Sequence, residues 1–358
     1  MRVTLQNRNT IGDVLYRILR KAGGYALLIT CSLFAVLTGK KLIFITTPFG
    51  DLGNRLFLFS NIIAFSLENN AIVIHLGLEH FRNHLEGTYT GLVACFPPSR
   101  WPKIQCNIFE SALKTLAWSA EAISLSRYSL RQWKAIRINN SSLMAFEMLD
   151  LENPQFRSWF KEKHVLFLSG YQYLASESIQ INQHLIRNYL RLRVSESEPL
   201  VARHREFLQN HDFVIGVVIR HGDYRQFMGG RYFYETTCYT RWIKQLMTLF
   251  PGKSLGFIIT GNDDVYPEGL DNIDFIFAPH SSLATRYVLS RCNMIISPPS
   301  SYAGWCAFSG NIPLLLISSS NQQIHLSDCR AIYNLSDLRE PSMPENIDHT
   351  QQLINEPI

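Results

Sequence analysis

The 358-residue sequence lacks the residue patterns of several common classes of protein. Its seven cysteines are scattered without a C-x-x-C pair, and an odd number in so long a chain argues against a disulfide framework. The histidines show no H-E-x-x-H spacing, so no familiar metal-binding motif is present. The glycines match neither G-x-G-x-x-G nor G-x-x-x-x-G-K-[ST], the phosphate-binding loops of NAD- and ATP-binding proteins. We therefore expect no metal, no cofactor and a reducing, cytoplasmic compartment.

Charged residues are also sparse. They make up 18% of the chain, with a formal net charge of +5. The basic residues form no long run and the arginines are dispersed, unlike the basic stripe that binds nucleic acid. The 46% hydrophobic content is ample for two cores, and the length exceeds the size at which one core usually keeps growing. The composition predicts a folded two-domain protein that binds no nucleic acid and accepts anionic ligands.

Apolar strand patterns alternate with helical patterns along most of the chain. The expected strands lie near 41–47, 71–76, 213–219, 255–260, 273–277, 293–297 and 313–317. Helices are expected over Leu58–Leu67 and Tyr239–Phe250. This alternation predicts an α/β protein with doubly wound, mostly parallel sheets. We expect Rossmann-like domains at 41–205 and 206–330 that face one cleft, and a polar C-terminal tail at 331–358.

Residues 1–40 are expected to form a separate helical extension. Apolar side chains recur at helical spacing from Ile11 to Leu19 with basic residues between them, and Gly23-Gly24 provides a hinge before the apolar run Tyr25–Thr38. That run is shorter than the roughly 18 to 20 residues that span a bilayer. Three alternatives remain: a helix packed on the core, a helix lying in the membrane interface, and a spanning helix. The second implies peripheral contact of residues 1–39 with the inner face of the membrane.

A candidate anion site follows the apolar run that ends at Ile219. Arg220, Gly222 and Asp223 come directly after it. In open α/β sheets ligands bind outside the carboxyl ends of strands, and an arginine there can hold two phosphate oxygens at once. Glycine at 222 permits a tight turn. The alternative is a surface ion pair between Arg220 and Asp223, which contributes little energy.

Four ordered segments carry recognisable motifs. They are GNRLF at Gly53–Phe57, GYQ at Gly170–Gln172 followed by Ser176-Glu177, VIRHGDY at Val218–Tyr224, and SSYAGW at Ser300–Trp305. The series resembles the motifs G-N-Q-[LM]-F, G-Y-x-Q-S-x-x-Y-F, H-x-R-R-G-D-Y and S-S-F-S-W-W of the alpha-1,2-fucosyltransferase family, glycosyltransferase family 11, within the wider fucosyltransferase superfamily. The resemblance covers roughly residues 41–320 and implies GT-B architecture.

The resemblance also implies a function. It is metal-independent, inverting transfer of L-fucose from the donor substrate GDP-fucose to a hydroxyl of an oligosaccharide or polysaccharide acceptor. Arg220 and Asp223 are the expected catalytic residues. The expected donor-binding residues are Gly53, Asn54, Arg220, Ser300, Ser301 and Tyr302.

Individual roles keep their alternatives at this stage. Asn54 either reaches the donor from the first domain or serves as a turn residue with positive φ. Ser300 caps a helix in either case, because a serine N-cap is compatible with anion binding at the helix N-terminus. Asp51 and Asp223 are the candidates for a general base.

The departures from the family motifs leave two further functions open. Val218 stands where the family has histidine, His221 where it has a second arginine, Arg55 where it has glutamine, and Gly304 where it has tryptophan. The family's histidine helps hold the nucleotide sugar. The alternatives are therefore a GT-B glycosyltransferase with another nucleotide-sugar donor, and a non-catalytic protein that binds nucleotide or glycan. The N-terminal helical patterns leave a third alternative, a membrane-docked assembly component.

Overall fold

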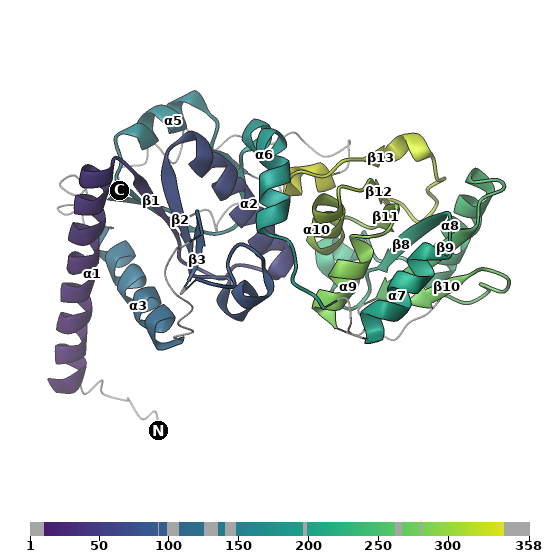
Figure 1. The fold of residues 1–358 in the computed structure, drawn as a ribbon, viewed down its shortest axis with the longest axis horizontal. Helices are drawn as coiled ribbons and strands as arrows, with labels where there is room; N and C mark the ends of the chain where they lie inside the picture. The colour runs from purple at the N-terminus through teal and green to yellow at the C-terminus, as the bar shows by residue number, and fades with distance from the viewer. Residues whose placement is uncertain are drawn as a thin grey trace, which may run out of the picture.

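The computed structural model describes residues 11–91, 93–98, 107–124, 135–139, 148–195, 199–261, 267–279 and 281–339. These form two α/β domains side by side, each with helices on both faces of its sheet (Figure 1). All seven expected strands are present, with ends that differ by at most two residues. The predicted α/β fold class with two Rossmann-like domains is confirmed.

The first domain contains a five-stranded sheet in the order β3-β2-β1-β6-β4, in which only β3 is antiparallel to its neighbour. Its strands are β1 (Lys41–Ile45), β2 (Ala71–His75), β3 (Ala94–Phe96), β4 (Ala135–Asn139) and β6 (Val165–Ser169). Its helices are α1 (Ile11–Thr38), α2 (Leu52–Glu68), α3 (Asn107–Ser124), α5 (Pro154–Lys161) and α6 (Ser176–Tyr189), with the short helix η1 (Glu79–His84) and a two-stranded ribbon of β5 (Leu149–Asp150) and β7 (Tyr173–Leu174).

The second domain contains a six-stranded sheet in the order β10-β9-β8-β11-β12-β13, in which only β13 is antiparallel. Its strands are β8 (Phe213–Ile219), β9 (Leu255–Gly261), β10 (Phe275–Phe277), β11 (Met294–Ser297), β12 (Leu314–Leu316) and β13 (Cys329–Arg330). Its helices are α7 (Pro199–Gln209), α8 (Thr236–Leu249), α9 (Ser282–Leu289) and α10 (Ser301–Gly310), with short helices η2 (Gly222–Arg225), η3 (Phe227–Gly230), η4 (Leu326–Asp328) and η5 (Leu335–Leu338).

The two domains share one apolar core across their boundary. Helix α2 of the first domain packs on α10 of the second, where the ring of Phe57 meets the edge of Trp305 at 5.3 Å between centroids. Phe57 and Trp305 are both fully buried. The guanidinium of Arg187 on α6 also donates a 2.6 Å hydrogen bond to the carbonyl of Phe308. These contacts fix how the loops at the facing ends of the two sheets approach each other.

The N-terminal segment differs from the expected hinged pair. Residues Ile11–Thr38 form one continuous helix, α1, which runs through Gly23 and Gly24. Gly23 allows close packing on α3, because a Cβ atom there would lie 2.5 Å from the side chain of Leu116. Leu28 and Cys31 are buried against the sheet. Gly23 therefore serves a helix contact, and the helix does not bend at the two glycines.

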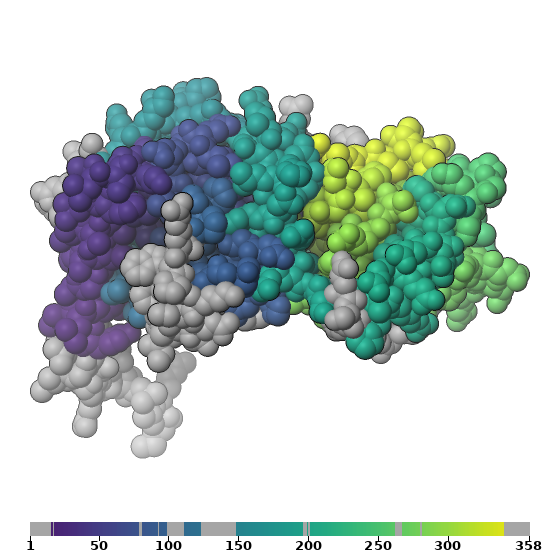
Figure 2. Space-filling model, viewed as in Figure 1, coloured from purple at the N-terminus to yellow at the C-terminus, as the bar shows by residue number. Residues whose placement is uncertain are grey.

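The opposite face of α1 is apolar and exposed. Leu33, Val36 and Leu37 have 56%, 65% and 84% of their surface exposed. The stretch Ile18–Thr38 is long and apolar enough to cross a bilayer by length and composition, although 28% of it is buried within the protein. In the space-filling view α1 forms the outer edge of the first domain, at the end of the molecule farthest from the second (Figure 2). Membrane contact through this face remains a proposal.

The described part of the segment expected as a polar tail, residues 331–339, packs on the second domain. Ile332 and Leu338 are buried, and Leu338 covers α10 at Gly304. Asn334 and Asp337 close this turn with a capping box. In the sequence, the apolar residues that recur every few positions between 331 and 339 were the signal that this stretch packs on the domain.

Candidate active site

Polar groups from the two domains converge on one cleft. In the second sheet the strand order reverses between β8 and β11, and in the first between β1 and β6. Loops that follow such neighbouring strands diverge to opposite faces, which leaves a crevice where ligands bind. The cleft has a volume of about 250 Å³ and receives side chains from both crevices.

Every residue predicted for the site lines this cleft. They are Gly53, Asn54, Arg220, Asp223, Ser300, Ser301 and Tyr302. The first two come from the start of α2, the next two follow β8, and the last three begin α10. Segments far apart in the chain are thus brought to one place by the two sheets.

Arg220 is fixed in the cleft wall by three contacts. Its Nη2 donates to both carboxylate oxygens of Asp223, at 3.1 and 3.3 Å, and its guanidinium lies 4.4 Å from the centroid of the Tyr224 ring. The Arg220 side chain is only 15% exposed, whereas Asp223 is 63% exposed. A surface ion pair would leave both groups in water, so the burial of Arg220 favours a ligand-binding role over the surface alternative.

The turn after β8 depends on Gly222. Its φ is +53°, a left-handed conformation that side chains with a Cβ rarely adopt. This turn places Asp223 and Tyr224 beside Arg220, and the Tyr224 hydroxyl donates to the carbonyl of Pro299 in the loop after β11. The two loops of the second-domain crevice are therefore tied together.

The N-terminus of α10 faces the cleft. Ser300 is its N-cap, and the Ser300 hydroxyl accepts a 3.2 Å hydrogen bond from the backbone N–H of Tyr302. The positive end of a helix dipole and the free N–H groups of a first turn attract anions. Ser301 lies at the same turn and lines the cleft without a hydrogen bond among the described residues.

Asn54 does not have the positive φ of the turn alternative. Helix α2 begins at Leu52 rather than Leu58, so Gly53 and Asn54 lie in its first turn, while Gly50 takes the left-handed conformation with φ of +66°. Leu52, Leu56 and Phe57 are buried, and this burial outweighs the low helix propensity of glycine and asparagine. The start of α2 thus lies at the cleft as a second helix N-terminus, with Asp51 at its N-cap.

Gly53 marks the closest approach of the two domains at the site. A Cβ atom at this position would lie 2.6 Å from the carbonyl oxygen of Ser301. No side chain fits there without moving backbone, so glycine permits α2 and α10 to meet.

Three of the four departures from the family motifs lie in protein contacts outside the cleft. His221 is buried and its Nε2 lies 2.8 Å from the carbonyl oxygen of Tyr234. Val218 is 2% exposed, in the core. Arg55 donates to the carbonyls of Gly50 and Gly77, both at 2.9 Å. None of these three is among the residues that line the cleft.

The fourth departure, Gly304, has a local explanation. A Cβ atom there would lie 2.8 Å from Leu338, which itself lines the cleft together with Leu335. The C-terminal turn therefore occupies the space that a side chain at 304 would need.

Sequence reasoning missed several residues of the cleft wall. Arg286, on α9, is the most consequential, because it adds a second cation, 4.5 Å from the centroid of the Tyr302 ring. It belongs to no motif, and only the position of α9 directly before β11 signals its nearness to the site. Tyr171 follows β6 and stacks on Phe49, with 4.8 Å between ring centroids. Met148, Phe227 and Tyr232 supply apolar surface.

Three tyrosines of the cleft are kept protonated by burial. Burial raises the pKa of the Tyr302, Tyr224 and Tyr171 hydroxyls above its ordinary value of 10.0. A phenol with a raised pKa stays protonated and cannot accept the proton of an acceptor hydroxyl, and the carboxylates that line the cleft are Asp51 and Asp223. Within the described residues no group of three or more His, Cys, Asp or Glu side chains is placed to hold a metal ion. Metal independence remains a prediction.

Comparison with known proteins identifies the fold. Neither a protein-family model nor a curated protein matches the chain. FUT1 from Arabidopsis thaliana, solved as a mutant in complex with GDP, is similar with a TM-score of 0.53 and 14% sequence identity, over 81% of this chain and 73% of that chain. Fucosyltransferase NodZ from Bradyrhizobium has a TM-score of 0.47 and 14% identity, over 82% and 99%. A TM-score below 0.5 does not establish a common fold, so of these two structures FUT1 is the one that bears on it.

The architecture and the shared fold define a GT-B-like α/β protein, two Rossmann-like domains with a cleft between their facing loops. At 14% identity the similarity to FUT1 extends to the fold alone. The reaction and its substrates are therefore argued from the site.

Proposed function

We propose that the chain is an inverting glycosyltransferase that transfers L-fucose from GDP-fucose to a hydroxyl of an oligosaccharide or polysaccharide. The observation that supports this most is the largely buried Arg220 facing the N-terminus of α10 in a cleft closed by the first domain. The motif resemblance points to the same family, and FUT1, which shares the fold, was solved with GDP bound.

The proposed chemistry is a direct displacement. The acceptor oxygen forms a bond to the anomeric carbon while the bond from that carbon to the β-phosphate oxygen breaks. Negative charge grows on the departing diphosphate, and Arg220 with the N-terminus of α10 stabilises it. A preorganised guanidinium does this without reorganisation, because Asp223 and Tyr224 already hold it in place.

The acceptor hydroxyl loses its proton as the new bond forms. Asp51 and Asp223 are the proposed recipients, one on each wall of the cleft. Asp223 already accepts two hydrogen bonds from Arg220, so both of its carboxylate oxygens are engaged in holding the guanidinium. Asp51 is therefore the stronger candidate for the proton acceptor.

Calorimetric titration of GDP, GDP-fucose, UDP and ADP, each with and without EDTA, tests the proposal. We expect GDP and GDP-fucose to bind in both conditions, and UDP and ADP to bind at least about tenfold more weakly, since a base-specific site leaves polar groups unpaired with the wrong base. A preference for UDP or ADP would point to another nucleotide-sugar donor. Binding that vanishes in EDTA would overturn metal independence, and GDP binding without transfer to any acceptor would favour a non-catalytic binding protein.

Peripheral membrane attachment through α1 is a separate part of the proposal. The exposed apolar face around Leu33, Val36 and Leu37 would enter the lipid interface, with basic residues of the same helix near anionic headgroups. Deleting residues 1–39 would also remove Leu28 and Cys31 from the core, so substitution is the cleaner test.

The double variant Leu33→Glu, Leu37→Glu is expected to lower binding to anionic vesicles at least about tenfold in sedimentation assays, because two charges oppose insertion of that face. The matched control is Ile181→Glu on α6, where the replaced side chain is 76% exposed. Equal vesicle binding by both variants would show that α1 is not the contact.

A further inference from the structure

A second arginine lies at the same helix N-terminus as the predicted donor-binding residues. Arg286 is on α9 and only 7% exposed, and it lines the cleft beside Ser300, Ser301 and Tyr302. Its Nη1 donates a 3.0 Å hydrogen bond to the carbonyl of Ser282 one turn earlier. Its guanidinium lies 4.5 Å from the centroid of the Tyr302 ring.

The charge of Arg286 is not balanced within the described residues. No carboxylate there lies within ion-pair distance of it, and its Nε has no hydrogen-bond partner there. A buried charge without a counter-ion is costly, and the adjacent N-terminus of α10 adds partial positive charge at the same place. The Arg286 guanidinium and the N-terminus of α10 together favour the binding of an anion at this place, and the described residues supply none.

We propose that Arg286 and the first turn of α10 form a second anion subsite, which binds the diphosphate of the nucleotide from the side opposite Arg220. This rests on the proposed function, because it concerns how the same nucleotide is held. The position equivalent to the family's second arginine is His221, which is engaged with the carbonyl of Tyr234. In this chain the second cation of the cleft therefore comes from α9 instead of the loop after β8.

The stacking on Tyr302 sets the orientation of the subsite. A guanidinium that lies over a ring keeps its edge N–H groups available for oxygen acceptors. Tyr302 is in turn held by the cap of Ser300 on its backbone N–H. The Tyr302 ring and the Ser282 carbonyl thus hold the guanidinium of Arg286 at the cleft, and a diphosphate offers more oxygen acceptors to it than a monophosphate.

Calorimetry with GDP and GMP on the full chain tests this inference. Arg286→Gln is expected to weaken GDP about thirtyfold and GMP less than about threefold, since it removes a charge-assisted contact to the diphosphate. Arg286→Lys should weaken GDP by an intermediate factor, because it keeps the charge and loses the planar fork. The matched control is Arg291→Gln, since Arg291 also lies over a tyrosine ring, 4.9 Å from the centroid of Tyr287, and outside the cleft.

The outcomes separate the two proposals. If wild type binds no nucleoside diphosphate, the proposed function fails and the inference with it. If wild type binds GDP and both Arg286 variants stay within about twofold of it, only the inference fails. Equal loss of GDP and GMP would also overturn it, because the contact would then not concern the diphosphate. Thermal unfolding without ligand identifies a variant that does not fold, and Arg286→Lys then carries the test.

Discussion

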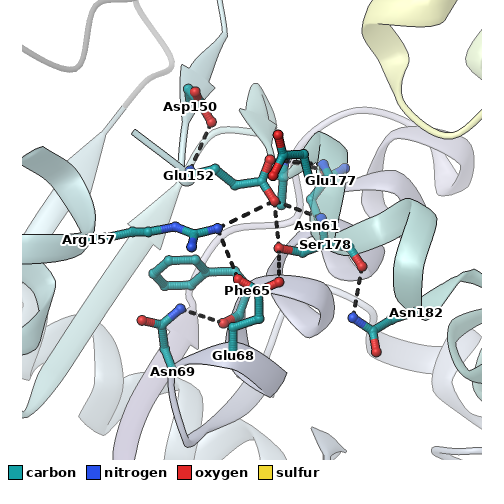
Figure 3. Close-up of polar contacts among 11 residues, drawn as sticks. Asn61, Phe65, Glu68, Asn69, Asp150, Glu152, Arg157, Glu177, Ser178 and Asn182 are labelled. Carbon is teal, nitrogen blue, oxygen red and sulfur yellow. Dashed lines mark hydrogen bonds and ion pairs between the residues drawn. The ribbon is translucent and has the colours of Figure 1, made fainter. Parts of the chain in front are cut away.

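Two helix N-termini in this molecule are surrounded by charged groups in opposite ways. At α6 the protein supplies the anion itself: the Glu152 carboxylate accepts hydrogen bonds from the backbone N–H groups of Glu177 and Ser178 at 2.9 and 2.7 Å (Figure 3). Arg157 and the Ser178 hydroxyl complete that cluster. At α10 the N-terminus faces a cleft whose wall contains Arg220 and Arg286, and no carboxylate of the described residues is hydrogen-bonded to it.

The difference shows how to distinguish a structural polar cluster from a ligand site. In this cluster the Glu152 side chain is only 11% exposed, each of its carboxylate oxygens accepts a backbone hydrogen bond, and Arg157 lies 3.7 Å from one of them. The polar groups of Glu152 are thus satisfied inside the protein. In the cleft Arg220 and Arg286 bring positive charge to a helix terminus that already favours anions. The first arrangement stabilises the fold, and the second is prepared for a negatively charged molecule.

The largest expected effect is from Arg220→Lys on the cleft side of this comparison. Lysine keeps one charge but cannot hold two phosphate oxygens in a planar fork. Transfer from GDP-fucose should fall by roughly 10² or more, as when one preorganised transition-state donor is removed. Thermal unfolding should change little. The measurement is turnover at matched folded concentration.

A variant that keeps more than about a third of wild-type turnover would contradict the role of Arg220, because losing a transition-state contact costs far more than that. Arg220 and Asp223 would then form an ordinary surface ion pair, which contributes under about 1 kcal/mol to stability. In that case the N-terminus of α10 would differ from that of α6 only in facing an open cleft, and not in binding an anion.

Glu152→Gln tests the structural cluster at the N-terminus of α6. It should lower stability and leave nucleotide binding unchanged. The substitution removes the charge that two N–H groups and Arg157 share, and we expect the free energy of unfolding to fall by about 2 kcal/mol. GDP affinity should stay within about twofold of wild type, since the cluster lies outside the cleft. Urea unfolding and calorimetry measure the two quantities.

Glu177→Gln is the control for Glu152→Gln. It makes the same change in charge at the same helix turn, on an exposed side chain with no hydrogen bond among the described residues, and should cost only a few tenths of a kcal/mol. If both variants unfold with the same free energy, the cluster contributes no more than a general dipole effect.

The sequence predicted the strands and the motif residues of the cleft because both depend on local patterns. Apolar runs located β8 and β11, and motif glycines, serines and an arginine located the loops at their carboxyl ends. The start of α2 was placed six residues too late, since Gly53 and Asn54 favour turns and only the burial of Leu52 and Leu56 makes them helical. No local sequence pattern marks a residue whose role depends on packing between separate segments. Arg286, which lies over the ring of Tyr302, is an example.

The same limit applies to α1 and to the Glu152 cluster. The adjacent glycines at 23 and 24 predict a hinge from the sequence alone, and only the contact with Leu116 shows why residue 23 is small. Glu152, Glu68 and Ser178 are separated by up to 110 positions. Their convergence comes from how α2 and α6 pack, which no spacing in the chain encodes.

The smallest expected effect concerns the contact that joins the two domains at the cleft. Gly53→Ala would place a Cβ atom 2.6 Å from the carbonyl oxygen of Ser301, so the backbone of α2 or α10 must shift by several tenths of an ångström. We expect kcat/KM to fall about tenfold, because small displacements of catalytic groups are costly. The free energy of unfolding should fall by about 1 kcal/mol, because overpacking strains the contact while alanine favours the helix. Gly23→Ala is the control: its Cβ would meet only the side chain of Leu116, far from the cleft, and should leave kcat/KM unchanged. Wild-type activity in Gly53→Ala would mean that α2 and α10 need not touch during turnover, and that the open N-terminus of α10 acts without support from the first domain.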